Sequence, residues 1–386
     1  MSPFRVRAPL LALCGALALG ASLARAQAAG PLQVSIGFAA PLSGENAVYG
    51  KDLEDGVQLA LDEANAESVR IDGRPAHFAL IAVDDRADPR AGVQAAQQLV
   101  NRNVPVVIGH FNSGTTIPAL RVYESAGIPM IDPAATNPAI TNQGFANAFM
   151  VIANDAQNAS HAADYALDVT KAKRIAILDD RSAFGQGEAD VFAQAVRRHG
   201  GTIVVRLYPG GDAADYRPLL AHIRAAHADL LFFGGFDTQA ATVAREMQQA
   251  HVDAQLVMGG GVANAAFIRL AGRAAEGAMA WEYGRPLAQL PDGQAFERKF
   301  RARFGVDVLS YAPFAYDATW AAIRAMEAAK SAQPDALRGA LRRVSFDGVT
   351  GHIAFAGNGA LRSSTSTLYQ VRQGAWVPIV TKHDGA

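Results

Sequence analysis

Cysteine is almost absent from this chain of 386 residues, which contains only Cys14. A single cysteine cannot form a disulfide within the chain, and Cys14 lies in an N-terminal apolar stretch that we expect to be removed. The mature protein is therefore expected to have no disulfide and no thiol chemistry. Its stability must come from hydrophobic cores, and the chain is long enough for two domains of typical size.

Long hydrophobic runs are also missing, apart from the one at the N-terminus. Arg5 and Arg7 precede an apolar run over 8–23, and residues 24–26 read Ala-Arg-Ala, the small-x-small pattern of a cleavage site. This run is shorter than a membrane-spanning helix requires. We therefore expect a secretory signal peptide over 1–26 and a periplasmic mature protein.

The sequence lacks the signatures of several other protein classes. Lys and Arg total 35 against 36 Asp and Glu, and no basic tract indicates a nucleic-acid partner. No GxGxxG follows the first expected strand, and no GxxxxGK[ST] occurs. The nine histidines form no HExxH motif or close ligand cluster, and Ser113 has no GxSxG context. We therefore expect no cofactor, no metal and no enzymatic activity.

Short β-branched runs alternate with amphipathic, Ala-rich stretches along most of the chain. This alternation predicts βαβ units, parallel sheets and an α/β fold. The expected strands are 34–38, 78–83, 104–108 and 129–131 in a first lobe, and 174–178, 203–207, 230–233 and 256–258 in a second. The expected helices between them are 49–66, 89–101 and 115–126, then 156–170, 187–199, 215–226 and 238–250.

The division into lobes follows from where the pattern restarts. It begins anew after 149–152, returns to helices at 296–304 and 311–329, and ends in a strand-rich stretch over 350–378. No Pro/Ser/Gly-rich linker intervenes, so the crossings between lobes must be short, as a hinge requires. We expect lobe 1 to comprise 32–151 and 283–350, and lobe 2 to comprise 152–282 and 351–386.

Two expected strands lead into loops of small hydroxylated residues, within 106–116 and 131–138. Ligands of open α/β sheets bind at the carboxyl ends of strands. The first loop opens a helix, whose free N–H groups and Ser113 hydroxyl suit a carboxylate. Helix capping by Ser113 is the alternative and is compatible with binding. The second loop, which carries Thr136, favours a ligand site.

Aromatic and acidic residues also follow expected strands. Tyr49, Phe184 and Phe236 lie in loops outside the periodic core positions. Aromatic residues are usually core residues, but these three are placed to line an apolar pocket. The pairs Asp84-Asp85 and Asp179-Asp180 end strands, where aspartates most often bond to loop N–H groups. We prefer that interpretation to acid–base catalysis or metal binding.

Several short motifs occur in a particular order along the chain. They are Pro41-Leu42-Ser43-Gly44 with Tyr49-Gly50, Asp84-Asp85 with Asp88-Pro89, Val107-Ile108-Gly109-His110, Pro133-Ala134-Ala135-Thr136, Phe184-Gly185-Gln186-Gly187, Gly234-Gly235-Phe236, and Gly261-Val262-Ala263-Asn264. The series resembles the leucine/isoleucine/valine-binding protein family, the periplasmic receptors of branched-chain amino acid ABC transporters. The resemblance implies a type I periplasmic-binding-protein fold, with two doubly wound lobes joined by three hinge crossings.

The resemblance also implies roles for individual residues. Ser113 and the adjacent backbone would hold the ligand carboxylate, while the Ala134 carbonyl and the Thr136 hydroxyl would take the α-amino group. The rest of the wall would be formed by Tyr49, Phe111, Asn112, Phe184, Phe236 and Tyr311. The implied partners are a small amino acid or carboxylate and an ABC permease in the inner membrane.

One departure from the family concerns the charge that faces the ligand ammonium. The family places a glutamate just before Gly-Val-Ala-Asn, whereas this chain has glycine at 259–261. A buried ammonium without a counter-charge is costly. Either Asp237 or Glu282 supplies the acid, or the ligand is not a standard α-amino acid. The alternatives are an amide or aromatic-acid receptor, or a sensory ligand-binding protein on the same fold.

Overall fold

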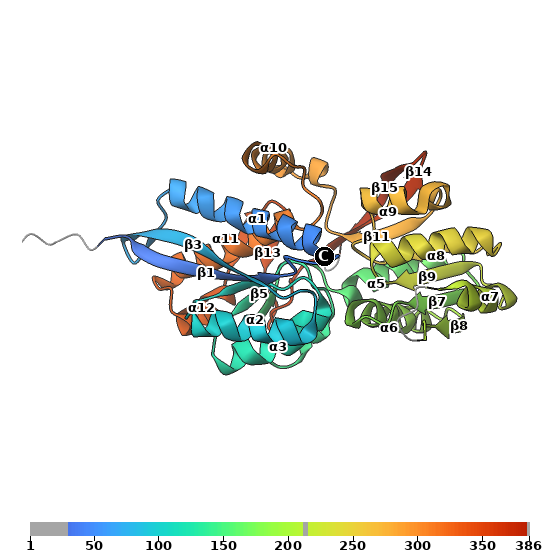
Figure 1. Ribbon diagram of the computed structural model, residues 1–386, viewed down its shortest axis with the longest axis horizontal. Coiled ribbons are helices and arrows are strands. Elements are labelled where there is room, and N and C mark those ends of the chain that lie inside the picture. Colours follow the sequence, from blue (N-terminus) through green and yellow to red (C-terminus); the bar gives the residue numbers. More distant parts are fainter. Residues whose placement is uncertain (1–29, 211–214, 384–386) are drawn as a thin grey trace, which may run out of the picture.

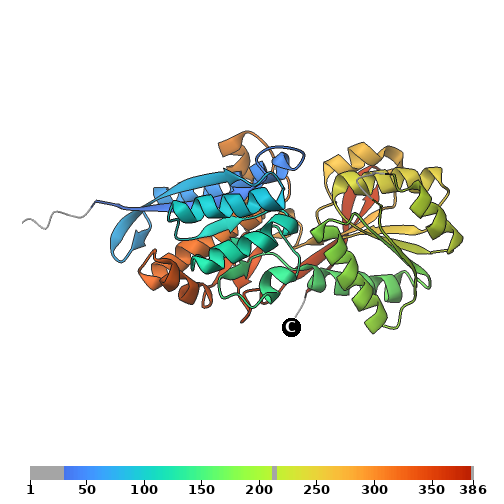
Figure 2. The same cartoon turned by 60° about the horizontal axis from the view of Figure 1, so that its bottom comes forward.

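The two halves of the chain build separate sheets. The computed structural model describes residues 30–210 and 215–383, so the expected signal peptide at 1–26 lies outside the described residues. One sheet has six strands in the order β2-β3-β1-β4-β5-β6, and the other has seven in the order β15-β14-β11-β10-β9-β7-β8. The two sheets and their helices form two lobes that lie end to end (Figures 1 and 2).

In the first lobe the strands run parallel except at the β2–β3 hairpin. Helices α1 and α11 pack against each other on one face, and α2 and α3 on the other (Figure 1). The strands are β1 (Leu32–Ala40), β2 (Arg70–Ile71), β3 (Arg74–Asp84), β4 (Val107–Gly109), β5 (Met130–Asp132) and β6 (Ala148–Met150). The helices are α1 (Ala47–Ala66), α2 (Pro89–Asn101), α3 (Ser113–Ser125), α4 (Ala139–Asn142), α11 (Ala312–Ala329) and α12 (Pro334–Leu341).

In the second lobe β8, β7, β9, β10 and β11 run parallel, and β14 and β15 add an antiparallel edge. The strands are β7 (Ile175–Asp179), β8 (Ile203–Leu207), β9 (Leu230–Gly234), β10 (Gln255–Met258), β11 (Met279–Tyr283), β14 (Thr365–Arg372) and β15 (Ala375–His383). The helices are α5 (Asp155–Asp164), continued by a π-helical turn (Tyr165–Val169), α6 (Ala183–Arg198), α7 (Arg217–Ala225), α8 (Asp237–Gln249) and α9 (Ala265–Ala271).

The remaining elements are distributed over the two lobes. They are α10 (Gly293–Phe304), the hairpin of β12 (Ser345–Gly348) and β13 (Gly351–Ala354), and 3₁₀ turns at Gly272–Ala275 and Leu287–Gln289. Ile353 and Phe355 are buried in the core of the first lobe, against which Leu361 also packs. We therefore place the third crossing after Leu361, later than the boundary at 350/351 that the sequence pattern suggested.

Most of the expected elements form, and local hydrogen bonds and proline positions determine where they begin and end. Helix α2 begins where the sequence indicates, because the Asp88 carboxylate accepts hydrogen bonds from the Arg90 and Ala91 N–H groups and Pro89 occupies the first turn. Strand β11 and helices α9 and α12 were not expected. Strand β11 contributes Tyr283 to the region between the lobes, so this omission concerns the site as well as the fold.

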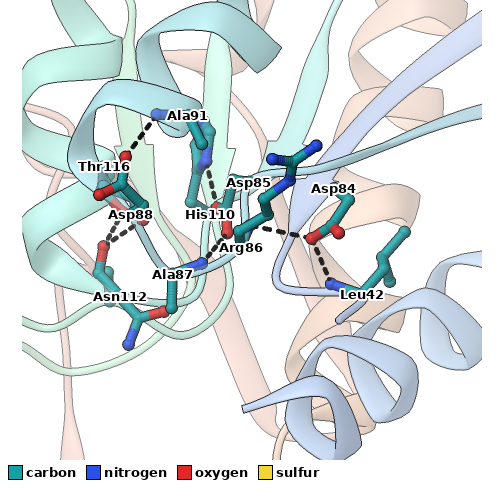
Figure 3. Close-up of polar contacts among 12 residues, drawn as sticks. Leu42, Asp84, Asp85, Arg86, Ala87, Asp88, Ala91, His110, Asn112 and Thr116 are labelled. Atoms are coloured by element: carbon teal, nitrogen blue, oxygen red, sulfur yellow. Dashed lines mark hydrogen bonds and ion pairs between the residues drawn. The ribbon is translucent and has the colours of Figure 1, made fainter. Parts of the chain in front are cut away.

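The acids that end β3 bond to loop amides and to a buried histidine, as expected for strand-end aspartates. Asp84 accepts a hydrogen bond from the Leu42 N–H (2.8 Å), and Asp85 accepts one from the Ala87 N–H (3.0 Å). The second oxygen of Asp85 lies 2.7 Å from His110 Nδ1, and His110 and Asp85 are fully buried. Figure 3 shows Asp84 and Asp85 pointing to opposite sides of the strand end, so each fixes a different loop.

Asp52 on α1 anchors the start of α11, where the chain has returned to the first lobe. Its buried carboxylate accepts hydrogen bonds from four consecutive N–H groups, those of residues 309–312, at 2.7–3.1 Å. An acid at a helix N-terminus also interacts favourably with the helix dipole. Because Tyr311 is one of the four donors, Asp52 sets the position of this aromatic ring.

Replacing Asp52 with alanine leaves four N–H groups without their acceptor. We expect Asp52→Ala to lower the free energy of unfolding by roughly 2–4 kcal/mol, measured by urea denaturation. Asp62→Ala, on the same helix, removes an exposed pairing with Arg303 and should change it by about 0–1 kcal/mol. Equal effects of the two substitutions would contradict the anchoring role.

Candidate ligand-binding site

A cavity lies between the lobes at the carboxyl ends of the parallel strands. Its lining side chains nearly fill it in this closed form, leaving about 20 Å³ open to a water-sized molecule. Its lining comes from both lobes: Tyr49, Phe111, Asn112, Ser113, Ala134, Ala135, Thr136 and Tyr311 from the first, Phe184, Phe236, Gly260 and Gly261 from the second, and Tyr283 at the end of β11, where the chain crosses between them.

Nine of the ten residues expected at the site line this one cavity. The tenth, Asp237, lies just behind the wall, where it accepts a 2.6 Å hydrogen bond from the Tyr49 hydroxyl. The sequence reasoning missed Ala135, Gly260, Gly261 and Tyr283. The glycines were visible as a run after an expected strand, but Tyr283 had no signal because β11 was not recognised.

The N-terminus of α3 forms one end of the cavity. The Thr115 and Thr116 N–H groups and hydroxyls donate to the Asn112 carbonyl, which closes the first turn of the helix. The first two helical residues, Ser113 and Gly114, have N–H groups that lack an intrahelical acceptor, as at any helix start. The Ser113 hydroxyl accepts a long hydrogen bond, 3.4 Å, from the Asn137 N–H. A positive helix end with a free hydroxyl is suited to an anion.

The loop after β5 lies beside this helix end, since its Asn137 N–H bonds to Ser113, and it presents different atoms. The fully buried Asp132 carboxylate accepts the Ala134 and Ala135 N–H groups at 2.8 and 2.7 Å. These amides are therefore engaged, and carbonyl and hydroxyl oxygens are what the loop offers to the cavity. Thr136 lies 3.2 Å from the Tyr283 hydroxyl. Oxygen acceptors of this kind suit a group that donates hydrogen bonds, such as an ammonium.

Aromatic rings form the side walls and connect the lobes. Tyr49 stacks on Phe111 at a centroid distance of 5.1 Å, and Tyr311 meets Phe111 edge-on at 5.3 Å. From the second lobe, Phe236 lies 6.3 Å from Phe111 and 5.2 Å from Phe184. The Phe236 N–H is held by Asp180 at 3.3 Å. This part of the cavity is therefore apolar and suits an aliphatic or aromatic side chain.

Polar contacts also join the lobes around the cavity. Asn137 of the first lobe donates to the Ala183 carbonyl of the second at 2.8 Å. Tyr49 bonds to Asp237, and Asn264 donates to both the Tyr49 hydroxyl (3.1 Å) and Asp237 (3.0 Å). These contacts hold the two lobes together over the cavity, so the structure shows them closed.

Four acids converge behind the cavity wall, and two of them are committed to local hydrogen bonds. The Glu282 carboxylate accepts the N–H groups of residues 261–263 at 2.6–2.9 Å and so fixes the glycine loop. Asp237 accepts hydrogen bonds from Tyr49 and Asn264 on one oxygen and from Thr238 on the other. These are the two acids that the sequence suggested as the missing counter-charge.

The other two acids, Asp155 and Glu188, are almost fully buried and only half satisfied. Asp155 accepts a 2.8 Å hydrogen bond from the Tyr283 hydroxyl, and Glu188 accepts one of 2.9 Å from the Gly260 N–H. The second oxygen of each has no hydrogen-bond partner among the described residues. Burial raises the pKa of Asp155 to about 6, and burial together with the charge of Asp155 raises the pKa of Glu188 well above its usual value.

Packing explains why 259 and 260 are glycines. A Cβ at Gly259 would lie 1.6 Å from Glu188 Oε1, and a Cβ at Gly260 would lie 2.0 Å from Tyr283 Cε2. Glu188 and Tyr283 therefore occupy the space that side chains on this loop would need. Two α/β lobes that close over a small cavity at the carboxyl ends of their strands define a two-lobed solute-binding protein.

The comparisons with known proteins agree with this class. The family model described as periplasmic binding protein matches residues 33–375, and the chain belongs to this family. A relative from Brucella suis biovar 1 (strain 1330), named Leu/Ile/Val-binding protein homolog 1, is 32% identical over 345 residues, or 89% of this chain and 91% of the relative. The resemblance inferred from the motifs is thereby confirmed.

Solved structures confirm the fold. A leucine-binding protein from Thermotoga maritima matches with a TM-score of 0.82 at 22% identity, covering 90% of this chain and 98% of that chain. A solute-binding protein of an ABC transporter from R. palustris, in complex with benzoate, matches with a TM-score of 0.77 at 20% identity, covering 91% and 96%. In the described parts of the chain, no helix has both the length and the apolar character needed to span a bilayer.

The packing at the glycine loop leads to a stability prediction. Gly260→Ala places a methyl group against the Tyr283 ring and should lower the free energy of unfolding by roughly 1–3 kcal/mol, the usual range for overpacking. Gly357→Ala is the control, since a Cβ there meets nothing within 4 Å, and it should stay within about 0.5 kcal/mol. Thermal unfolding of both variants checks the prediction, and a neutral Gly260→Ala would contradict the tight packing.

Proposed function

We propose that this chain is the periplasmic receptor of an ABC importer and that it binds a branched-chain or related small amino acid in the cavity between its lobes. The observation that carries the proposal is the arrangement of the cavity. An anion-binding helix end at Ser113 lies beside the oxygen acceptors of the Thr136 loop, and aromatic rings form the rest of the wall. An α-amino acid presents a carboxylate, an ammonium and a side chain with this same polarity.

The roles proposed for individual residues follow from this polarity. The α3 N-terminus and the Ser113 hydroxyl bind the carboxylate. The Ala134 carbonyl and the Thr136 hydroxyl accept hydrogen bonds from the ammonium. Tyr49, Phe111, Asn112, Phe184, Phe236 and Tyr311 surround the rest of the ligand, with Asp237 orienting Tyr49. The name of the Brucella relative supports a leucine-, isoleucine- or valine-like side chain.

Transport, and not chemical conversion, is the proposed outcome of binding. A ligand that contacts both lobes stabilises the closed form, because only that form brings all of its contacts together. The closed protein then delivers the ligand to a permease in the inner membrane. The domain division at residues 151/152 and 282/283, with a third crossing after Leu361, supplies the hinge for this motion.

A receptor for aromatic or other carboxylates that lack an ammonium is the second candidate. The glycine loop at 259–261 carries no acid, and aromatic rings such as Phe111 and Phe236 form the cavity walls. The R. palustris neighbour, which is related in fold, was solved with benzoate. This candidate keeps the carboxylate at Ser113 and differs only at the ammonium end.

A thermal-shift panel on the ligand-stripped mature protein tests the proposal. The panel contains the twenty amino acids, their keto acids, short amides and benzoate. A ligand present at about 100 times its Kd adds about 2.7 kcal/mol to the unfolding free energy, which gives a clear rise in Tm. We expect leucine, isoleucine or valine to give the largest rise. A rise with benzoate or keto acids alone would select the second candidate.

The carboxylate role of Ser113 is tested by Ser113→Ala. Loss of one hydrogen bond to a charged group should weaken binding of the responding amino acid by roughly 1–3 kcal/mol in calorimetry. Ser125→Ala at the other end of α3 removes an exposed hydroxyl that bonds only to the Arg121 carbonyl, and it should leave the affinity unchanged. Unchanged affinity in Ser113→Ala would place the carboxylate elsewhere.

A further inference from the structure

We propose that Glu188, together with Asp155, supplies the negative charge that faces the ligand ammonium, in place of an acid on the glycine loop. This inference rests on the proposed function, because it presupposes a ligand that carries an ammonium. Neither residue was among the candidates that the sequence suggested, since Glu188 lies on α6, outside the glycine loop.

Elimination among the four acids gives the first argument. Glu282 is saturated by three backbone N–H groups, and both oxygens of Asp237 accept hydrogen bonds. Asp155 and Glu188 each retain a buried oxygen without a partner among the described residues, as does Asp132 under the loop after β5. Buried polar atoms are normally satisfied, so two such oxygens beside one cavity indicate a missing donor.

Their position gives the second argument. Glu188 bonds to the Gly260 N–H, and Asp155 bonds to the Tyr283 hydroxyl, which also lies 3.2 Å from Thr136 Oγ1. Gly260, Tyr283 and Thr136 all line the cavity, at the end where the oxygen acceptors lie. The two acids therefore lie behind the wall residues that the ammonium would contact, and each is separated from the cavity by one of these residues. At this distance they act through charge and through the groups that they orient.

The glycine loop gives the third argument. The Glu188 carboxylate lies where a side chain at position 259 would begin, 1.6 Å from the ideal Cβ position. A carboxylate thus approaches this end of the cavity from the helix beneath the loop, and the absence of a side chain at position 259 leaves room for it.

Charge balance gives the fourth argument. The neighbouring charges that act on Glu188 come from Asp155, Glu282 and Asp180, all of which are acidic. Carboxyl groups gathered in a dry environment resist ionisation, which raises the pKa of Glu188, and a cation brought among them relieves that cost. A neutral or purely anionic ligand offers no such relief. The cluster therefore favours an ammonium-bearing ligand over an aromatic carboxylate.

Glu188→Gln is the direct test, because the amide has nearly the same shape and its oxygen still accepts the Gly260 N–H. We expect the affinity for leucine, measured by calorimetry, to fall by roughly tenfold or more. The affinity for 4-methylpentanoate, which is leucine without its amino group, should stay the same or rise. The Tm of the ligand-free protein should also rise, since a buried charge has been removed. A purely structural glutamate would instead lower the Tm and weaken both ligands alike.

Glu246→Gln is the matched control, because Glu246 also accepts one backbone N–H, from Tyr216 at 2.8 Å, but lies away from the cavity. It should leave both affinities unchanged. If Glu188→Gln does not fold, Asp155→Asn takes its place with the same expected selectivity.

Two outcomes overturn the proposal in distinguishable ways. If the wild-type protein binds leucine and Glu188→Gln binds it equally well, the assignment of the acid is wrong while the amino-acid receptor stands. If the wild-type protein binds 4-methylpentanoate or benzoate but no amino acid, the proposed ligand class fails and this assignment fails with it. Selective loss of leucine binding in Glu188→Gln supports both.

Discussion

Buried carboxylates that accept hydrogen bonds from loop amides are the interaction on which the site depends. Asp52 receives four amides at the start of α11, Asp132 receives two in the loop after β5, and Glu282 receives three in the glycine loop. Each bond satisfies a loop whose backbone would otherwise lack partners, and each charge-assisted bond is stronger than a neutral one. Carboxylates on the side away from the cavity therefore hold the loops that shape it. The polar groups on the inner surface of the cavity remain available to bind a ligand.

The same principle makes the exceptions informative. Asp132, Asp155 and Glu188 are all deeply buried, and each has one oxygen that the described chain leaves without a hydrogen bond. Protein interiors usually contain unsatisfied charges only at functional sites, where a ligand or a proton completes them. The second lobe thus contributes two buried carboxyl groups that a cation would help to ionise, while the first lobe contributes the positive end of α3. A ligand with separated charges matches both.

Much of the architecture was predictable from the sequence, because strand and helix periodicities are local. The hydroxylated loops near Ser113 and Thr136 were also recognisable, since their composition departs from the periodic pattern on either side. Tyr283 and Glu188 were not predictable in this way. Tyr283 belongs to a strand that the sequence pattern does not predict. Glu188 lies within an ordinary amphipathic helix, where an acidic residue is normally expected to face solvent. Only the packing of α6 beneath Gly259 shows that this carboxylate is buried.

The most direct measurement is a crystal structure of the mature protein with leucine. The account predicts a leucine molecule enclosed between the lobes, with its carboxylate at the α3 N-terminus within hydrogen-bonding distance of Ser113. Its ammonium should lie at the Thr136 and Tyr283 end, on the side of Glu188. A leucine bound in the reverse orientation, or outside this cavity, would contradict the account.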